Sequence, residues 1–167
     1  MITKIKNAAI LQILLYLSPM NIYLIGDRMG SGIQWLFFRY HQTSIGNGFI
    51  LLNREIVFVT SGVLIGRSAI ATLIDVIGVG LIVVATLLIA MDYLNDKSAY
   101  LKWAAMINFA GAIVLLISAL FQYGITLQGL SGIDIPFGVP IILIIAFWQY
   151  RLASAPPADV ETADDTA

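Results

Sequence analysis

Cysteine is absent from this chain of 167 residues. Without thiols the protein can form no disulfide, no iron–sulfur cluster and no thiolate metal site. Histidine occurs once, at His41, with no Asp, Glu or Cys cluster at ligand spacing, so we expect no metal site. Residues 26–32 are rich in glycine but lack the Gly-Lys-Ser/Thr ending of a P-loop, and no nucleophile elbow is present. We therefore expect neither enzymatic activity nor a cofactor.

Charge is scarce as well. Asp, Glu, Lys and Arg make up 11% of the sequence, against roughly 25% in a soluble domain, while 59% of the residues are hydrophobic. Ionised side chains lose their hydration in hydrocarbon, so long stretches without them are typical of membrane proteins. The net charge of −1 provides no basic surface for nucleic acid. The lipid bilayer is therefore the expected environment, and nucleic acid is not an expected partner.

Four apolar segments approach the roughly 20 residues that cross a bilayer as a helix. They are residues 7–26, 69–91, 103–121 and 135–150. The first follows a basic flank and lacks a small-residue cleavage site, which favours a retained helix over a cleaved signal peptide. We predict an all-α membrane protein in which residues 1–152 form a four-transmembrane-helix bundle. The tail, residues 153–167, is acidic, contains proline and should be disordered.

Residues 27–67 are too long and too apolar for a plain linker between the first two predicted helices. They are rich in β-branched residues, and Asn47-Gly48 is a strong hairpin signal. We expect a small β-prone extracytoplasmic loop domain with strands at Ile33–Ile45, Phe49–Leu52 and Glu55–Thr60. An interfacial helix over Ile33–Tyr40 is the competing interpretation.

This loop concentrates aromatic side chains, namely Trp35, Phe37, Phe38 and Tyr40. Trp and Tyr prefer the headgroup level of a bilayer, where the ring is buried and the polar tip stays wet. Phe37, Phe38, Phe49 and Phe58 add apolar area beyond what one small sheet can hide. The loop either caps the helices or presents an adhesive face to another subunit. We take Trp35, Phe37, Phe38 and Tyr40 as the candidate interface.

Asp75 lies about six residues inside the second predicted helix, where a carboxylate is costly enough to suggest a function. The residues expected at its level are Asn21 and Tyr23 from the first helix, and Ser118 and Gln122 from the third. Such an intramembrane polar site can fix helix register, bind a cation or proton, or pair with a loop arginine. A second polar layer, nearer the opposite surface, would combine Gln12, Thr86, Asn108 and Gln149.

The positive-inside rule gives a small excess of Lys and Arg on the N-terminal side. Together with the long folded loop, this predicts a multi-pass plasma-membrane protein with cytoplasmic N- and C-termini. The absence of a catalytic constellation favours a non-enzymatic assembly or accessory subunit. Its aromatic loop would contact a homo-oligomer or a membrane-protein partner. The alternative hypothesis is a small channel or transporter that uses Asp75 as a cation or proton site.

Overall fold

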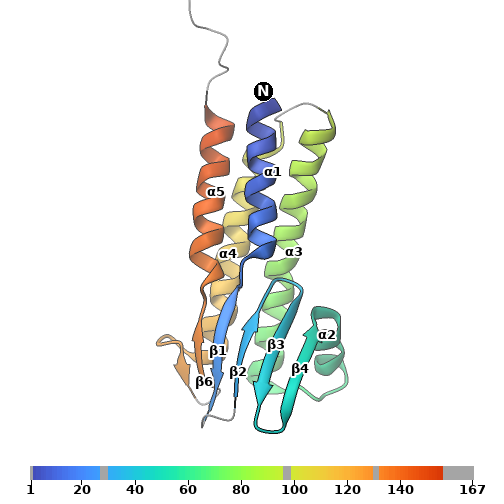
Figure 1. Ribbon diagram of the computed structural model, residues 1–167, viewed down its shortest axis with the longest axis vertical. Helices are drawn as coiled ribbons and strands as arrows, with labels where there is room; N and C mark the ends of the chain where they lie inside the picture. Colours follow the sequence, from blue (N-terminus) through green and yellow to red (C-terminus); the bar gives the residue numbers. More distant parts are fainter. Residues whose placement is uncertain (1, 27–29, 96–98, 130–131, 156–167) are drawn as a thin grey trace, which may run out of the picture.

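The computed structural model describes residues 2–26, 30–95, 99–129 and 132–155, which form five helices and six strands. The helices are α1 (Ile2–Leu17), α2 (Leu52–Thr60), α3 (Gly66–Asn95), α4 (Leu101–Tyr123) and α5 (Gly138–Ser154). The strands are β1 (Asn21–Ile25), β2 (Gly30–Gln34), β3 (Phe38–Thr43), β4 (Gly46–Leu51), β5 (Gln128–Gly129) and β6 (Gly132–Ile135). Helices α1, α3, α4 and α5 run side by side, and the sheet extends the molecule beyond the ends of α1 and α5 (Figure 1).

The predicted fold class, an all-α bundle of four transmembrane helices, is wrong. Among the described residues two helices, α3 and α4, are long and apolar enough to cross a membrane. Helices α1 and α5 have 16 and 17 residues. The predicted segment 7–26 is divided between α1 and β1, and the helix in the segment 135–150 begins only at Gly138, after β6 ends at Ile135. Pro19 follows the end of α1, and a proline disfavours helical conformation in the residue before it. The predicted tail lies outside the described residues from position 156 onward, while positions 153 and 154 belong to α5.

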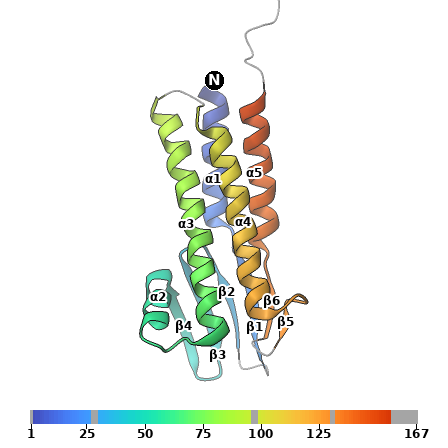
Figure 2. The ribbon, with the colours of Figure 1, turned by 180° about the vertical axis from the view of Figure 1, so that it is seen from behind.

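All six strands form one antiparallel sheet in the order β4-β3-β2-β1-β6-β5. Strand β1 continues the chain from α1, and β6 leads into α5, so these two paired strands connect the sheet to both shorter helices. Behind the sheet lie the N-terminal part of α3 and the C-terminal part of α4 (Figure 2). The sheet therefore has one face against these two helices and one face turned away from them.

The predicted loop strands differ from the observed ones in register and extent. Strands β3 and β4 form a hairpin, but its turn lies at residues 44–45, since Thr43 pairs with Gly46. Gly48 lies within β4, opposite His41, whose ring covers it: a Cβ on Gly48 would be 2.5 Å from His41 Cε1. The range 55–60, predicted as a strand, belongs to α2. The range 33–40 is neither one strand nor a helix, because β2 ends and β3 begins within it.

Helices α3 and α4 approach each other closely because both carry small residues where they meet. A Cβ on Gly111 would lie 3.3 Å from the carbonyl oxygen of Gly78, and a Cβ on Gly78 would lie 2.7 Å from the Leu115 side chain. Ala71, Ala85 and other small residues of both helices are buried nearby. Small residues at the contact therefore let these two helices pack closely.

A buried hydrogen-bond network joins the four long elements at mid-height. Asn108 Nδ2 of α4 donates to Oε1 of Gln12 in α1 and to Oε1 of Gln149 in α5, both at 2.8 Å. Gln12 Nε2 in turn donates to Thr86 Oγ1 of α3 at 2.9 Å. The three amide side chains are at most 2% exposed. The expected second polar layer is confirmed, and it fixes the relative register of α1, α3, α4 and α5 because slippage would leave its amides unpaired.

Candidate functional site

Side chains of successive residues in a strand point to opposite faces, so the strand register sorts the sheet into two surfaces. We call the surface against α3 and α4 the inner face, and the surface turned away from them the outer face. One row across the inner face consists of Gly48, His41, Gly32, Tyr23 and Asp134. The adjacent row across the outer face consists of Phe49, Tyr40, Ile33, Ile22 and Ile135. In these two rows the buried side carries the polar groups and the exposed side carries the apolar ones, which reverses the usual arrangement. The next row of the outer face, toward the hairpin turn, contains the polar residues Ser31, Gln42, Asn47 and Gln128.

The inner face meets the helices in a cluster of polar side chains around a small cavity of about 30 Å³. This volume can hold roughly one or two water molecules. The cavity is lined by all five residues of the predicted polar site, Asn21, Tyr23, Asp75, Ser118 and Gln122. Sequence reasoning missed other members that line it as well, including Gln34, Arg39, Glu55, Thr72 and Tyr123.

Asp75 links α3 to the sheet. Asp75 is 8% exposed, and its Oδ2 accepts a hydrogen bond from Gln34 Nε2 of β2 at 3.0 Å. Ser118 Oγ donates to the carbonyl oxygen of Ala71 at 2.8 Å and so ties α4 to α3 beside it. These bonds place the Asp75 carboxylate at the boundary between the helices and the sheet, with a side-chain donor from the loop region as its partner.

An ion pair supports the same cluster from β3 and α2. Arg39 Nε lies 2.8 Å from Glu55 Oε1, and the Glu55 side chain is 7% exposed. Burial raises the pKa of Glu55, and the adjacent Arg39 guanidinium opposes that rise. Burial likewise raises the pKa of the Tyr23 hydroxyl, which stays neutral at physiological pH. Helix α2 is therefore held against the sheet by a buried charge pair rather than by a free surface acid.

Asp134 is a buried carboxyl group of the inner face that lacks hydrogen-bond donors among the described residues. It lies in β6 opposite Tyr23 and is 2% exposed, and within the described part of the chain neither of its carboxylate oxygens has a hydrogen-bond partner. Burial raises its pKa from 3.8 to about 7. The other titratable groups that interact with it are Tyr23 in β1, Tyr123 in α4 and Asp75 in α3. A carboxyl group in this position is protonated at mildly acidic pH.

Stability is expected to fall as pH rises from 4 to 7. Between these values the folded protein holds a proton on Asp134 that the unfolded chain releases, so each step up in pH favours unfolding. The pKa of about 7 corresponds to a loss of roughly 2–4 kcal/mol, with little further change above pH 7. Thermal unfolding in detergent from pH 4 to pH 8 measures this loss. Asp134→Asn should make the profile less steep and raise the melting temperature at pH 8, while Glu55, whose pKa is also raised by burial, retains part of the slope.

The matched control is the same substitution at a buried carboxylate that has donors. Asp92 is 1% exposed and accepts bonds from the Tyr100 backbone N–H at 3.0 and 3.1 Å. Asp92→Asn should lower the melting temperature at pH 8, because it weakens these charge-assisted bonds. A wild-type profile that is flat between pH 4 and pH 8 would contradict the assignment to Asp134.

The outer face has no formal charge along its six described strands, and it is apolar apart from the row that contains Ser31, Gln42, Asn47 and Gln128. Seven large apolar residues on it are between 38% and 56% exposed: Ile22, Leu24, Tyr40, Phe49, Leu51, Ile133 and Ile135. A large side chain presents roughly 200 Å² when fully exposed, so these seven leave on the order of 700 Å² of mostly apolar surface in contact with the surroundings. The largest apolar patch of a typical monomer is about 300–600 Å². Apolar patches above this size are typical of interaction surfaces.

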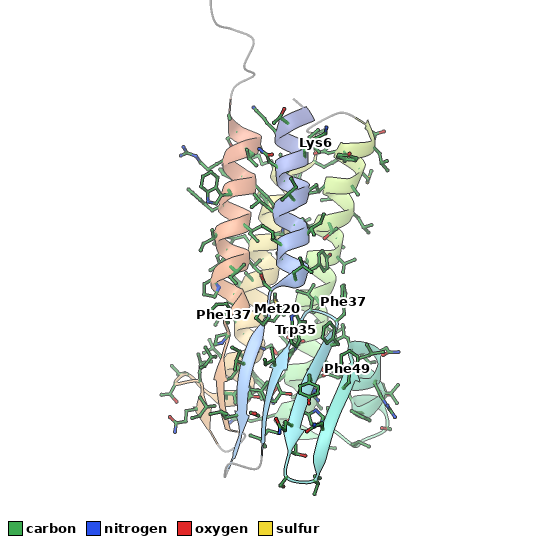
Figure 3. The ribbon with its side chains drawn as sticks, in the orientation of Figure 1. Lys6, Met20, Trp35, Phe37, Phe49 and Phe137 are labelled. Carbon is green, nitrogen blue, oxygen red and sulfur yellow. The ribbon has the colours of Figure 1, made fainter. Side chains whose placement is uncertain are left out.

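The four aromatic residues expected at an interface occupy two places. Trp35 stacks on Phe38 with ring centroids 4.9 Å apart, and Phe38 lies 4.9 Å from Phe49 on the sheet. Phe37 stacks instead on Tyr16 of α1 at 5.6 Å and connects the loop to the helices. Figure 3 shows Trp35 and Phe37 where the sheet meets the helices, and Phe49 farther along the sheet. Trp35, Phe38 and Phe49 thus form one aromatic stack. Tyr40 is the register partner of Phe49 and lies on the same face.

Comparison with known proteins identifies no relative: no protein-family model matches the chain, and no curated protein matches it.

Proposed function

We propose that the protein is a non-enzymatic integral membrane protein that serves as an assembly or accessory subunit, with the outer face of its sheet as the docking surface. The observation that supports this most is the reversed polarity of the sheet. Both formally charged residues of the described strands, Arg39 and Asp134, face inward, and the outer face keeps its exposed apolar side chains without a charge. Leaving about 700 Å² of apolar surface in water is unfavourable at roughly 25 cal/mol per Å², so burial against a partner is favoured.

Helices α3 and α4 are the proposed membrane anchors. With 30 residues, α3 is about 45 Å long, whereas the hydrocarbon layer is about 30 Å thick. The N-terminal part of α3 that lies behind the sheet accounts for this excess (Figure 2). An open sheet edge is not tolerated in hydrocarbon, because its backbone groups would lack partners. We therefore place the sheet in water beside the membrane, where its outer face can meet a protein.

The proposed location is the plasma membrane, with a multi-pass topology and both termini cytoplasmic. Both ends of the described chain lie at the end of the molecule opposite the sheet, and Lys4 Nζ donates to the Ala155 carbonyl oxygen at 2.6 Å. Single cysteines can test this without background, since the chain has none. In intact cells a membrane-impermeant maleimide should label Ser44→Cys at the hairpin turn and spare Ser154→Cys. The reverse pattern would invert the topology.

Photo-cross-linking in native membranes tests the proposed function. Benzoylphenylalanine is placed at Phe49, which is 56% exposed on the outer face, and at Ile125, which is 93% exposed in the turn after α4. Position 49 should give a discrete protein adduct on illumination, and position 125 should not, because it lies outside the docking surface. Adducts with lipid alone at position 49, or equal protein adducts at both positions, would contradict the proposal.

The alternative proposal is a small channel or transporter that uses the inner-face cavity. It is motivated by three buried carboxylates, Asp75, Glu55 and Asp134, beside one guanidinium, Arg39. Asp75→Asn separates the two functions. In an assembly subunit, the substituted amide still accepts the bond from Gln34 and the protein stays as stable as the wild type, whereas Asp75→Leu costs about 1–3 kcal/mol because Gln34 loses its partner. Cation or proton flux in liposomes that is present in the wild type and lost in Asp75→Asn would favour the transporter.

A further inference from the structure

We infer that the partner of the outer face is a second copy of this chain, and that the two sheets pack face to face about a two-fold axis parallel to the helices. This inference rests on the proposed function and names its partner. It follows from three properties of the outer face: the order of residues across it, its direction, and its area.

The central row of the outer face is complementary to itself. The strand register aligns Phe49, Tyr40, Ile33, Ile22 and Ile135 side by side, with Ile33 of β2 in the middle. One half of the row is aromatic and the other half is aliphatic. A two-fold axis that runs between the two Ile33 side chains sets this residue against its own copy. The same rotation sets Tyr40 against Ile22 and Phe49 against Ile135, so each aromatic ring meets a smaller branched side chain, as interdigitated sheet packing requires.

The direction of the face brings copies in the same membrane together. The strands run nearly along the axes of the long helices, so the outer face looks sideways rather than toward the bilayer (Figure 1). Two copies anchored in one membrane carry this face at the same height. A two-fold axis along the membrane normal then brings the two faces into register, and this is the commonest symmetry of homo-oligomers. The absence of charge from the outer face means that no like charges oppose each other in that arrangement.

The area is sufficient for a stable pair. A standard interface buries about 800 Å² per partner, and the seven most exposed apolar side chains alone offer on the order of 700 Å². Phe38 and Ile33 are less exposed and add to that area. Pairing through the sheet edge is less suitable, because the edge strand β5 has two residues and α2 contacts β4 at the other edge. Face-to-face packing therefore buries more apolar surface than edge pairing.

Site-directed cross-linking between differently tagged copies tests the inference in native membranes. Packed sheets lie about 10 Å apart, which is too far for a disulfide, so a short bis-maleimide is the reagent. Ile33→Cys alone should link the two tags, because residue 33 faces its own copy across the axis. Phe49→Cys in one copy should link to Ile135→Cys in the other, and neither of these should link efficiently to itself. Ile125→Cys is the control, and thermal unfolding of each variant verifies that it is folded.

The outcomes separate the inference from the function on which it rests. Linkage of the two tags through position 33 and through the 49–135 pair supports a second copy. If the folded variants link no tags while benzoylphenylalanine at position 49 captures a different polypeptide, the partner is another protein and the inference is overturned, but the proposed function stands. If position 49 captures no protein at all, both are overturned.

Discussion

Ile33→Lys is expected to separate the two copies while each remains folded. In the proposed pair the two substituted side chains lie across the two-fold axis from each other, so two ammonium groups would be buried together without a counter-charge. Like charges placed against each other in an interface cost several kcal/mol, which corresponds to an association at least about a hundredfold weaker. Energy transfer between labelled copies, measured as a function of protein density in liposomes, gives the dissociation constant of the wild type and of the variant.

A complementary variant makes this prediction specific to the two-fold axis. Ile33→Glu should also be monomeric alone, but a mixture of the Lys and Glu variants should associate again, because opposite charges now meet. Ile125→Lys introduces the same charge at a residue that is 93% exposed outside the outer face, and it should associate like the wild type. Undiminished association of Ile33→Lys, or no recovery in the mixture, would mean that residue 33 does not face its own copy.

Gly132→Ala is expected to disrupt the sheet and to lower stability by about 3 kcal/mol or more. Gly132 begins β6 with a φ of +122°, a conformation that L-residues with a side chain rarely adopt. A Cβ at this position would also overlap with the carbonyl oxygen of Leu24 in the paired strand β1. Because β6 connects the sheet to α5, the damage should spread beyond one strand. The measurement is thermal unfolding in detergent, followed by the loss of strand signal in circular dichroism.

Gly80→Ala is the matched control for this substitution. Gly80 lies in the middle of α3, and nothing lies within 4 Å of the position that a Cβ would take. Alanine is favoured over glycine in a helix by about 0.5–1 kcal/mol, so this variant should be as stable as the wild type or slightly more stable. Equal melting temperatures for Gly132→Ala and the wild type would show that β6 does not pair with β1 as described.

The helices could be predicted from the sequence where they are long and uninterrupted. Helices α3 and α4 extend the predicted ranges 69–91 and 103–121 by a few residues at each end, because an apolar run of this length has few other solutions. The strands β1 and β6 could not be predicted in the same way. In β1 the exposed residues Ile22 and Leu24 are apolar, and the buried residue between them is Tyr23. The sequence therefore lacks the usual alternation of polar and apolar residues, and this strand looks like the continuation of an apolar helix. Pro19 was the local signal that α1 ends early.

Part of the site could be predicted from the sequence, because the depth of a residue along antiparallel helices can be estimated from its position. That estimate identified five residues that line one cavity in the structure, namely Asn21, Tyr23, Asp75, Ser118 and Gln122. Gln34 and Arg39 were missed because a strand was predicted across the break between β2 and β3, and alternation along it would put these residues on opposite faces. Glu55 was missed because its range was predicted as a strand and belongs to α2. A register error exchanges the two faces of a strand. The reversed polarity of the sheet, and with it the docking surface, therefore became visible from the paired strands alone.

Protection of the outer face in native membranes tests the central claim most directly. The rates at which a water-soluble maleimide reacts with Tyr40→Cys, in the middle of the outer face, and with Ser44→Cys, at the turn of the same hairpin, are compared in the same membranes. Tyr40→Cys should react about tenfold or more slowly than Ser44→Cys, because a partner excludes water from the centre of an interface. The difference should largely disappear when Ile33→Lys is added. Similar rates at both positions, or protection that persists with Ile33→Lys, would contradict an outer face covered by a second copy.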